Sequence, residues 1–237
     1  MLPAAVSAPW PEHLDTAQFR AWFGQSQVVD AQGRPLVVYH GTTPWTKADG
    51  RQLGDIQAFD RMASVNIVGR RPSLDTLGSW FSSEPGQTGA EMYSGSTGAI
   101  YPVHLAIARP WRVTFASMVR IGHRMAGTDP DTVMVAPGVM EPAAFRFGQA
   151  QVDGLRTWLK TMGYDGIALK ADPYKAGNDE FAGQQAWIAL EPGQIKSAIA
   201  NNGDYNPEDP RLCFKRAAEP EPAADQDEED RACAPRF

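Results

Sequence analysis

Apolar residues recur along the chain at two spacings, which predict where strands and helices form. Alternating or short continuous apolar runs are typical of strands. They cover residues 36–40, 79–83, 101–107, 111–115, 166–169 and 187–190, with a further strand or turn at 194–199. Apolar residues three or four apart mark helices at 15–24 and 152–163, each ended by a glycine. Because the elements do not alternate as strand, helix, strand, we expect an α+β fold rather than a doubly wound α/β fold.

Local signals refine some of these elements. Asp15 and Gln18 have the spacing of a capping box, so Asp15 is expected to cap the first helix. Pro102 interrupts an alternating run and predicts an edge strand, because proline cannot donate a hydrogen bond to a neighbouring strand. Residues 43–77 and 116–150 show no clear period. We expect a long loop region with short elements in the first of them and an insertion with some helix in the second.

Composition bounds the class of protein. The chain has 237 residues, of which 43% are hydrophobic, so it can bury a core. No run of about 18 apolar residues is present, which excludes a helical membrane span, and no secretory signal is visible. The net charge is −6, but residues 216–237 hold seven acidic and only three basic residues. We therefore expect an irregular lead-in at 1–14, one domain at 15–210 and an acidic, disordered tail at 211–237.

The sequence gives no support for metal or thiol chemistry. The four histidines are too scattered for a local metal motif. His13 and His123 lie in polar stretches and are expected to be solvated, whereas His104 lies inside an alternating run and is expected to be structural. Cys213 and Cys233 are the two cysteines, and we favour unpaired thiols over one disulfide. No glycine-rich phosphate loop and no serine nucleophile motif occurs.

His40 stands out among the histidines. It ends the apolar run at 36–40 and is followed at once by Gly41 and Thr42. A polar ring and then a glycine at a strand end lie at the rim of a sheet, where the main chain can approach a ligand. The alternative is a histidine whose hydrogen bonds are satisfied locally at the strand end.

Later blocks extend this signal. The segment 39–42 reads YHGT, and GSWFS at 78–82 is followed by Ala90 and, three residues on, Tyr93. WIAL at 187–190, QIKSA at 194–198 and NGDY at 202–205 complete the series. In this order and spacing the chain resembles the ADP-ribosyltransferase superfamily, in particular the domains found in phage and plasmid polyvalent proteins. The resemblance, to the His-Tyr-Glu branch of poly-ADP-ribose polymerases and diphtheria toxin, covers about residues 17–210.

The resemblance implies a split pair of small antiparallel sheets with peripheral helices, whose cleft binds NAD as co-substrate and holds no metal. His40 would bond a ribose hydroxyl, Gly41 would pair through its main chain with the nicotinamide carboxamide, and Thr42 would add a polar contact. Trp80, where relatives have tyrosine, and Tyr93 would stack on the nicotinamide ring. The alternative for these aromatic residues is core packing.

Ala186 departs from the family pattern. The resemblance places there the glutamate that stabilises the ribosyl cation as nicotinamide leaves. Three explanations compete: this chain carries a replacement of a parental glutamate, a loop acid such as Asp179 or Glu180 takes its place, or the protein is a weak or inactive member without the glutamate. Because the other blocks are kept, we favour the first.

The loop at 174–185 occupies the position that recognises the acceptor in related enzymes. Glu180, Phe181 and Gln184 are the residues that the resemblance assigns to acceptor recognition, with Phe181 as a docking aromatic. The alternative is a solvated linker.

The function implied is a mono-ADP-ribosyltransferase that moves ADP-ribose from NAD to a macromolecular acceptor, either protein or nucleic acid. Phage and toxin relatives suggest an effector in the cytoplasm of a producing or target bacterial cell, with an immunity or antitoxin protein as a further partner. The alternatives are a catalytically inactive NAD-fold binding module, which the substitutions at Ala186 and Trp80 support, and an NAD glycohydrolase.

Overall fold

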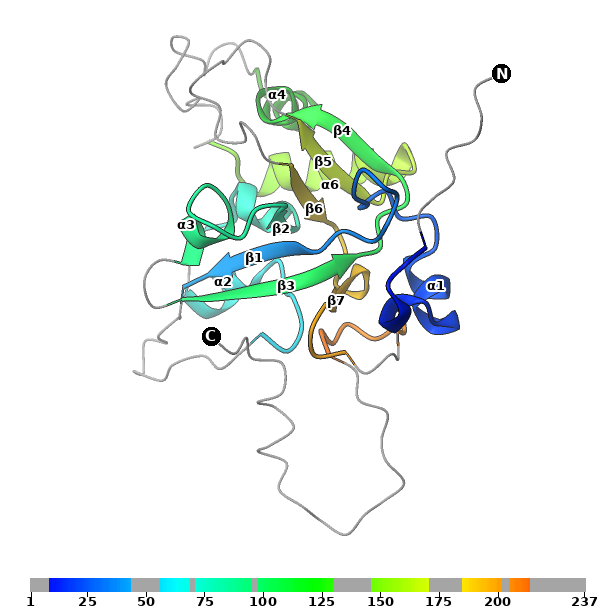
Figure 1. Cartoon of the computed structure of the whole chain (residues 1–237). Coiled ribbons are helices and arrows are strands. Elements are labelled where there is room, and N and C mark those ends of the chain that lie inside the picture. The colour runs from blue at the N-terminus through cyan, green and yellow to red at the C-terminus, as the bar shows by residue number, and fades with distance from the viewer. Residues whose placement is uncertain are drawn as a thin grey trace, which may run out of the picture.

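The computed structural model describes residues 9–43, 56–68, 71–94, 98–129, 146–170, 185–201 and 205–213. Within these residues, seven strands form one mixed sheet in the order β4-β5-β6-β2-β1-β3-β7 (Figure 1). The strands are β1 Val38–Thr42, β2 Ser79–Ser82, β3 Ala99–Leu105, β4 Pro110–Thr114, β5 Gly166–Lys170, β6 Ala186–Ala189 and β7 Ile195–Ser197. All neighbours are antiparallel except β4 and β5, which are parallel.

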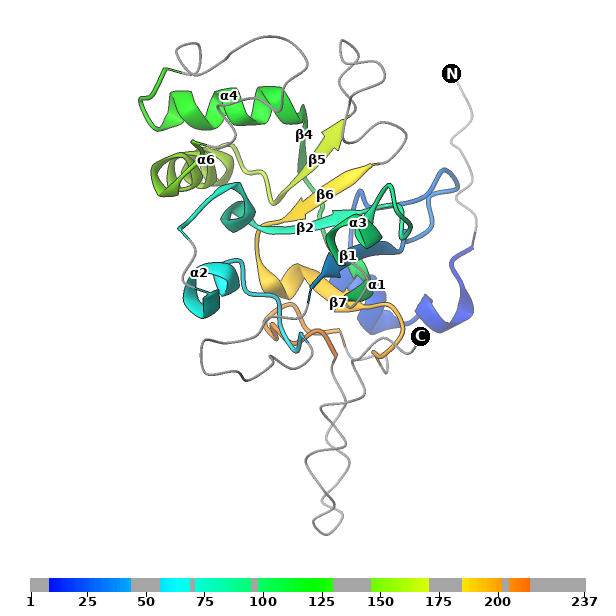
Figure 2. The ribbon, with the colours of Figure 1, turned by 90° about the vertical axis from the view of Figure 1, so that its left-hand side faces the viewer.

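Helices surround this sheet, so the prediction of an α+β fold is confirmed. The α-helices described are α1 Ala17–Phe23, α2 Ala63–Val68, α3 Ala90–Ser94, α4 Phe115–Met125 and α6 Gln149–Thr161. Short 3₁₀ helices lie at η1 Glu12–Leu14, η2 Leu74–Leu77 and η3 Pro192–Gln194. Figure 2 shows α4 and α6 side by side against the β4–β5 end of the sheet, and α3 packs on β1 and β3.

The sheet has two halves that meet between β1 and β2. Four residue pairs join β2 to β6 and five join β1 to β3, whereas β1 and β2 pair only at Tyr39 and Ser82. The two sheets expected from the resemblance are therefore hydrogen-bonded into one, with a weak seam where they would separate. Separate apolar clusters form the core, one under α4 and α6, one around β1, β3 and β7, and a third within η1 and α1.

Two local predictions were wrong for identifiable reasons. Strand β3 lies between β1 and β7 and is not an edge strand. Pro102 is tolerated because its main chain faces β7 just beyond the last residue of that strand. There only the carbonyl of Pro102 forms a hydrogen bond, which it accepts from Ala198 N at 3.0 Å. The cap of α1 is Thr16, whose hydroxyl accepts from Phe19 N, while Asp15 forms an ion pair with Arg20 instead.

The predictions for the other three histidines were partly right. His104 is buried, donates from Nδ1 to Leu36 O at 3.3 Å and packs edge-on against Phe19, so its structural role is confirmed. His13 is exposed as expected. His123 was expected to be solvated and is buried, because its Nδ1 lies 2.9 Å from Thr128 Oγ1 and Phe147 packs edge-on against its ring.

Other expectations concern the ends of the chain and metals. Cys213 is disulfide-bonded, so the prediction of two unpaired thiols was wrong. The proposed tail falls mostly outside the described residues. In the part of the chain that the structure describes, no helix is long and apolar enough to cross a membrane, and no group of three or more metal-ligating side chains occurs.

Candidate functional site

The seam between β1 and β2 is where the sheet opens. Beyond the pair of Tyr39 and Ser82, the main chain of β2 does not continue the ladder with β1. Instead the Nδ1–H of His40 donates to the main-chain oxygen of Trp80 at 2.8 Å. A side chain thus occupies the acceptor that the next rung of the ladder would have used.

The register of β3 decides which way Gly41 faces. The carbonyl of Pro102 points to β7, where it accepts from Ala198 N. Main-chain groups alternate in direction along a strand, so Tyr101 turns its groups towards its partner His40 in β1. The N–H and C=O of Gly41 therefore point to the other edge of β1, towards the seam with β2. This is the edge at which a bound ligand could take the place of a strand.

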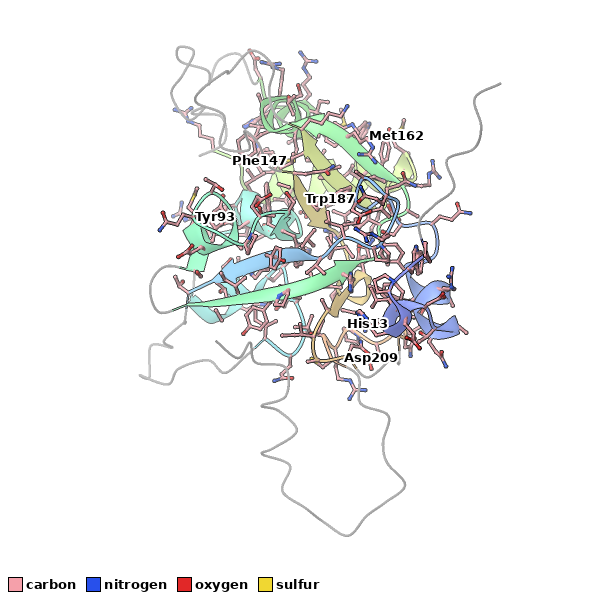
Figure 3. All side chains as sticks on the ribbon, in the orientation of Figure 1. His13, Tyr93, Phe147, Met162, Trp187 and Asp209 are labelled. Atoms are coloured by element: carbon pink, nitrogen blue, oxygen red, sulfur yellow. The ribbon has the colours of Figure 1, made fainter. Side chains whose placement is uncertain are left out.

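Helix α3 packs directly on Gly41. A Cβ added to Gly41 would lie 1.8 Å from Ala90 O and 3.2 Å from Ser94 N, so only glycine allows this approach. Ala90 and Ser94 are buried by the contact, whereas Tyr93 is 51% exposed and projects from α3 (Figure 3). Thr42 is half-buried, and its hydroxyl donates to Thr43 O at 3.3 Å.

His40 and Trp80 reach the seam from opposite faces of the sheet. The ring of His40 packs edge-on against Phe59, with 4.9 Å between ring centroids, and lies 5.6 Å from Phe81. The indole of Trp80 packs on the other face, 6.5 Å from Phe115. Phe81 is buried in the core, as the alternation predicts. The aromatic neighbour of His40 is therefore Phe81 and not Trp80.

The electrostatics of His40 follow from its surroundings. Burial lowers the pKa of His40, and the hydrogen bond to Trp80 O opposes this shift. The neutral ring is therefore favoured, with its proton on Nδ1 and a lone pair on Nε2. Such a ring can accept a hydrogen bond from a hydroxyl group.

Trp80 contributes an unused donor. Its Nε1–H is buried and has no hydrogen-bond partner among the described residues. A buried donor without a partner costs about 1–3 kcal/mol and calls for an explanation such as a ligand. Trp187, in the middle of the sheet (Figure 3), also has a buried Nε1–H without such a partner, but its ring lies under Arg112 on the other face.

Ala186 begins β6 next to this seam. It lies directly across from Ser82 of β2 and from Leu169 of β5, and it is 4% exposed. Its methyl group belongs to the core cluster under α4 and α6. The strand is anchored beyond this point by Ser83 and Gln185, which exchange two hydrogen bonds of 2.8 and 3.0 Å.

The QIKSA block has a structural explanation. Gln194 uses all of its side-chain capacity, accepting from Leu190 N and Glu191 N and donating to Ala106 O and Asp165 O. Lys196, fully buried, donates from Nζ to the main-chain oxygens of two residues in the segment 205–213. The block therefore clamps turns and the C-terminal segment onto the sheet, away from the seam.

Cavities among the described residues include two of similar size. One of about 350 Å³ is lined by Phe59, whose ring also packs edge-on against His40, and by Arg61, Ser79 and Glu191. The other, of about 380 Å³, lies between the end of α1 and η3 and includes none of the predicted site residues. The first cavity reaches the start of β2 at Ser79, and neither cavity is lined by His40, Gly41 or Trp80.

The structure does not describe the residues predicted to recognise the acceptor. Asp179, Glu180, Phe181 and Gln184 lie outside the described residues. Sequence reasoning missed Ser82, which stands opposite both Tyr39 and Ala186 and accepts from Glu84 N at 2.9 Å. Ser82 is recognised only from the strand register, which is known only once the fold is known.

Comparison with known proteins gives one result. The family model described as ADP-ribosyltransferase in polyvalent proteins matches residues 30–205. This span includes every strand of the sheet and both sides of the seam. Searches of curated proteins and of solved structures found no match.

Proposed function

The chain belongs to the ADP-ribosyltransferases of polyvalent proteins, and from that premise we propose that it binds NAD at the seam between β1 and β2 and transfers ADP-ribose to a macromolecular acceptor. The family in general uses NAD as co-substrate. The acceptor is protein or nucleic acid, and the role is that of an effector.

The main chain of Gly41 is the observation that carries this proposal. Its N–H and C=O face the open seam, side by side, as a donor and an acceptor. A primary carboxamide presents the complementary pair, one C=O and one N–H. Nicotinamide bound here would extend β1 as a short piece of strand does, and α3 would exclude larger groups on the side of Gly41.

Two further groups fit the rest of the ligand. The Nε2 lone pair of neutral His40 can accept from a ribose hydroxyl, because Nδ1 is occupied by Trp80 O. The Nε1–H of Trp80 offers a donor that no described residue uses. Phe59, which packs against His40, also lines a cavity of about 350 Å³, and we place the remaining part of the dinucleotide there.

The proposed chemistry needs few groups. The bond between C1′ of the nicotinamide ribose and the pyridinium nitrogen breaks, and its electron pair leaves with nicotinamide. A lone pair of the acceptor then bonds to C1′, and the acceptor loses a proton. Positioning of the ribose and a carboxylate that stabilises the cationic ribosyl group supply the catalysis.

A direct test uses the purified chain with NAD labelled in the adenylate phosphate. Calorimetry measures binding, and transfer of label to protein and nucleic acid of a bacterial lysate measures reaction. The proposal predicts saturable NAD binding and label on a discrete acceptor. The proposal would be refuted if the chain failed to bind NAD at millimolar concentration.

Ala186 favours a second candidate, a binding module without catalysis. Its methyl group is buried in the core where the family has a carboxylate. In that case NAD binds at the seam, and neither nicotinamide nor labelled product is formed by the parent chain.

A further inference from the structure

We propose that Glu84 supplies the carboxylate that the reaction needs and that Ala186 lacks. This inference rests on the proposed function. It adds a residue outside the loop at 174–185 and outside the position of the family glutamate.

The first argument is the position of Glu84 relative to Ala186. Ser82 and Ala186 are directly paired, and paired residues on one face of antiparallel strands have Cβ atoms about 4.5–5.5 Å apart. The main-chain N–H of Glu84 donates to the hydroxyl of Ser82 at 2.9 Å. Glu84 therefore begins the turn that follows β2, and its main chain is hydrogen-bonded to Ser82, the residue opposite Ala186.

The second argument is its connection to Gly41. The carbonyl of Glu84 accepts from Ala90 N at 2.9 Å. Ala90 is the residue whose own carbonyl packs against Gly41. Glu84 is thus fixed between the two parts of the candidate site, Ala186 on β6 and the open main chain of β1.

The turn that holds Glu84 is closely packed. A Cβ added to Gly89 would lie 1.9 Å from Glu84 O and 2.7 Å from Ser82 Oγ, so the main chain of 82–90 folds back tightly on itself. The side chain of Glu84 is exposed. The carboxylate is therefore attached at a fixed point of the main chain and is not occupied by packing in the core.

Glu91 provides a comparison on the same segment. It is also an exposed glutamate, and its N–H bonds to the carbonyls of Pro85 and Gly86. Its N–H donates to neither Ser82 nor Ala90, and Ala186 is paired to neither of its neighbours. Glu91 is therefore a matched control of the same charge, seven residues further along.

In the reaction, the Glu84 carboxylate stabilises positive charge on the ribosyl group as the C1′–N bond breaks. It then takes the proton that the acceptor loses as the new bond to C1′ forms. No other reactant is needed. Loss of such a group costs about 100-fold or more in rate.

The experiment compares the parent chain with E84Q and E91Q. Nicotinamide release and label transfer are measured, together with the Kd for NAD by calorimetry. Glutamine keeps the size of the side chain, and both main-chain hydrogen bonds of Glu84 remain. The inference predicts an active parent, a loss of about 100-fold or more in E84Q with the Kd for NAD changed less than threefold, and E91Q within twofold of the parent.

Each other outcome has a defined meaning. An active parent with E84Q equal to E91Q overturns the role of Glu84 and leaves the proposed function standing. The same holds if D179N or E180Q abolishes the reaction and E84Q does not. A parent that binds NAD without reacting also overturns the role of Glu84, whereas a parent that does not bind NAD removes the proposed function itself.

Discussion

The Nδ1 atom of His40 lies 2.8 Å from the main-chain oxygen of Trp80, and this hydrogen bond ends the ladder between β1 and β2. Because the side chain of His40 takes the carbonyl of Trp80, the main chain of Gly41 is left facing the seam. The same contact leaves the second ring nitrogen of His40 as an acceptor, which we propose bonds a ligand hydroxyl. The residue that ends the ladder is therefore also one that we propose contacts the ligand.

Replacing His40 by alanine is expected to weaken NAD binding. The variant H40A loses one hydrogen bond to the ligand, which corresponds to about a 5- to 10-fold rise in Kd. Calorimetry with NAD measures the change. The control is H104A, at a buried histidine in the neighbouring strand, which is expected to lower stability and leave the Kd of the folded protein unchanged. An unchanged Kd in H40A would refute the role assigned to His40.

Adding a methyl group to Gly41 is expected to displace α3. The Cβ of G41A would lie 1.8 Å from Ala90 O, which is main chain and cannot move without the helix. We expect the free energy of unfolding to fall by about 1–3 kcal/mol or more. Chemical denaturation measures it, with G86A as control because nothing lies within 4 Å of a Cβ at Gly86. Equal stability of the two variants would contradict the packing described.

Burial of His104 makes stability depend on pH. Burial lowers the pKa of His104 from 6.5 to about 4, so the unfolded chain binds a proton more readily than the folded one. The contribution is fully present above pH 6.5 and is lost as the pH falls towards 4, by about 3 kcal/mol in total. Burial lowers the pKa of His40 in the same direction. Urea unfolding between pH 4 and 7 should show this slope, and H104Q should flatten it; an identical slope would count against the burial of His104.

Gln194 is expected to act on stability and not on the ligand. Its side chain makes four hydrogen bonds to main-chain groups of three different turns. The variant Q194A should lower the free energy of unfolding by about 2–4 kcal/mol. The Kd for NAD, measured below the unfolding transition, should stay within threefold of the parent. A selective loss of NAD binding with unchanged stability would show that Gln194 belongs to the site instead.

The strands and the sheet class follow from the sequence because their apolar residues are local signals. Alternation predicted β3, and the continuous runs predicted β1 and β6, since each buried face must be apolar whatever its neighbour. Pro102 was misread because its fit depends on where β7 ends, and β7 lies more than ninety residues later in the chain. The burial of His123 depends likewise on Phe147 and Thr128, which a polar local sequence does not reveal.

The site shows the same division. Sequence motifs mark His40, Gly41, Trp80 and Ala186, because each of these residues lies in or next to a motif that is confined to one strand. The motifs do not show which of these side chains share a face of the sheet. Only the register of β1 with β2 shows that His40 lies on the face of Phe81 and not on that of Trp80. The neighbourhood of Ser82 and Glu84 comes from that register alone.

A crystal structure of the chain with bound NAD tests the central claim most directly. The predicted result is the nicotinamide carboxamide bonded to the N–H and C=O of Gly41, within the seam between β1 and β2, and a ribose hydroxyl bonded to Nε2 of His40. NAD bound at another place, or a seam that stays empty at saturating NAD, would contradict the account.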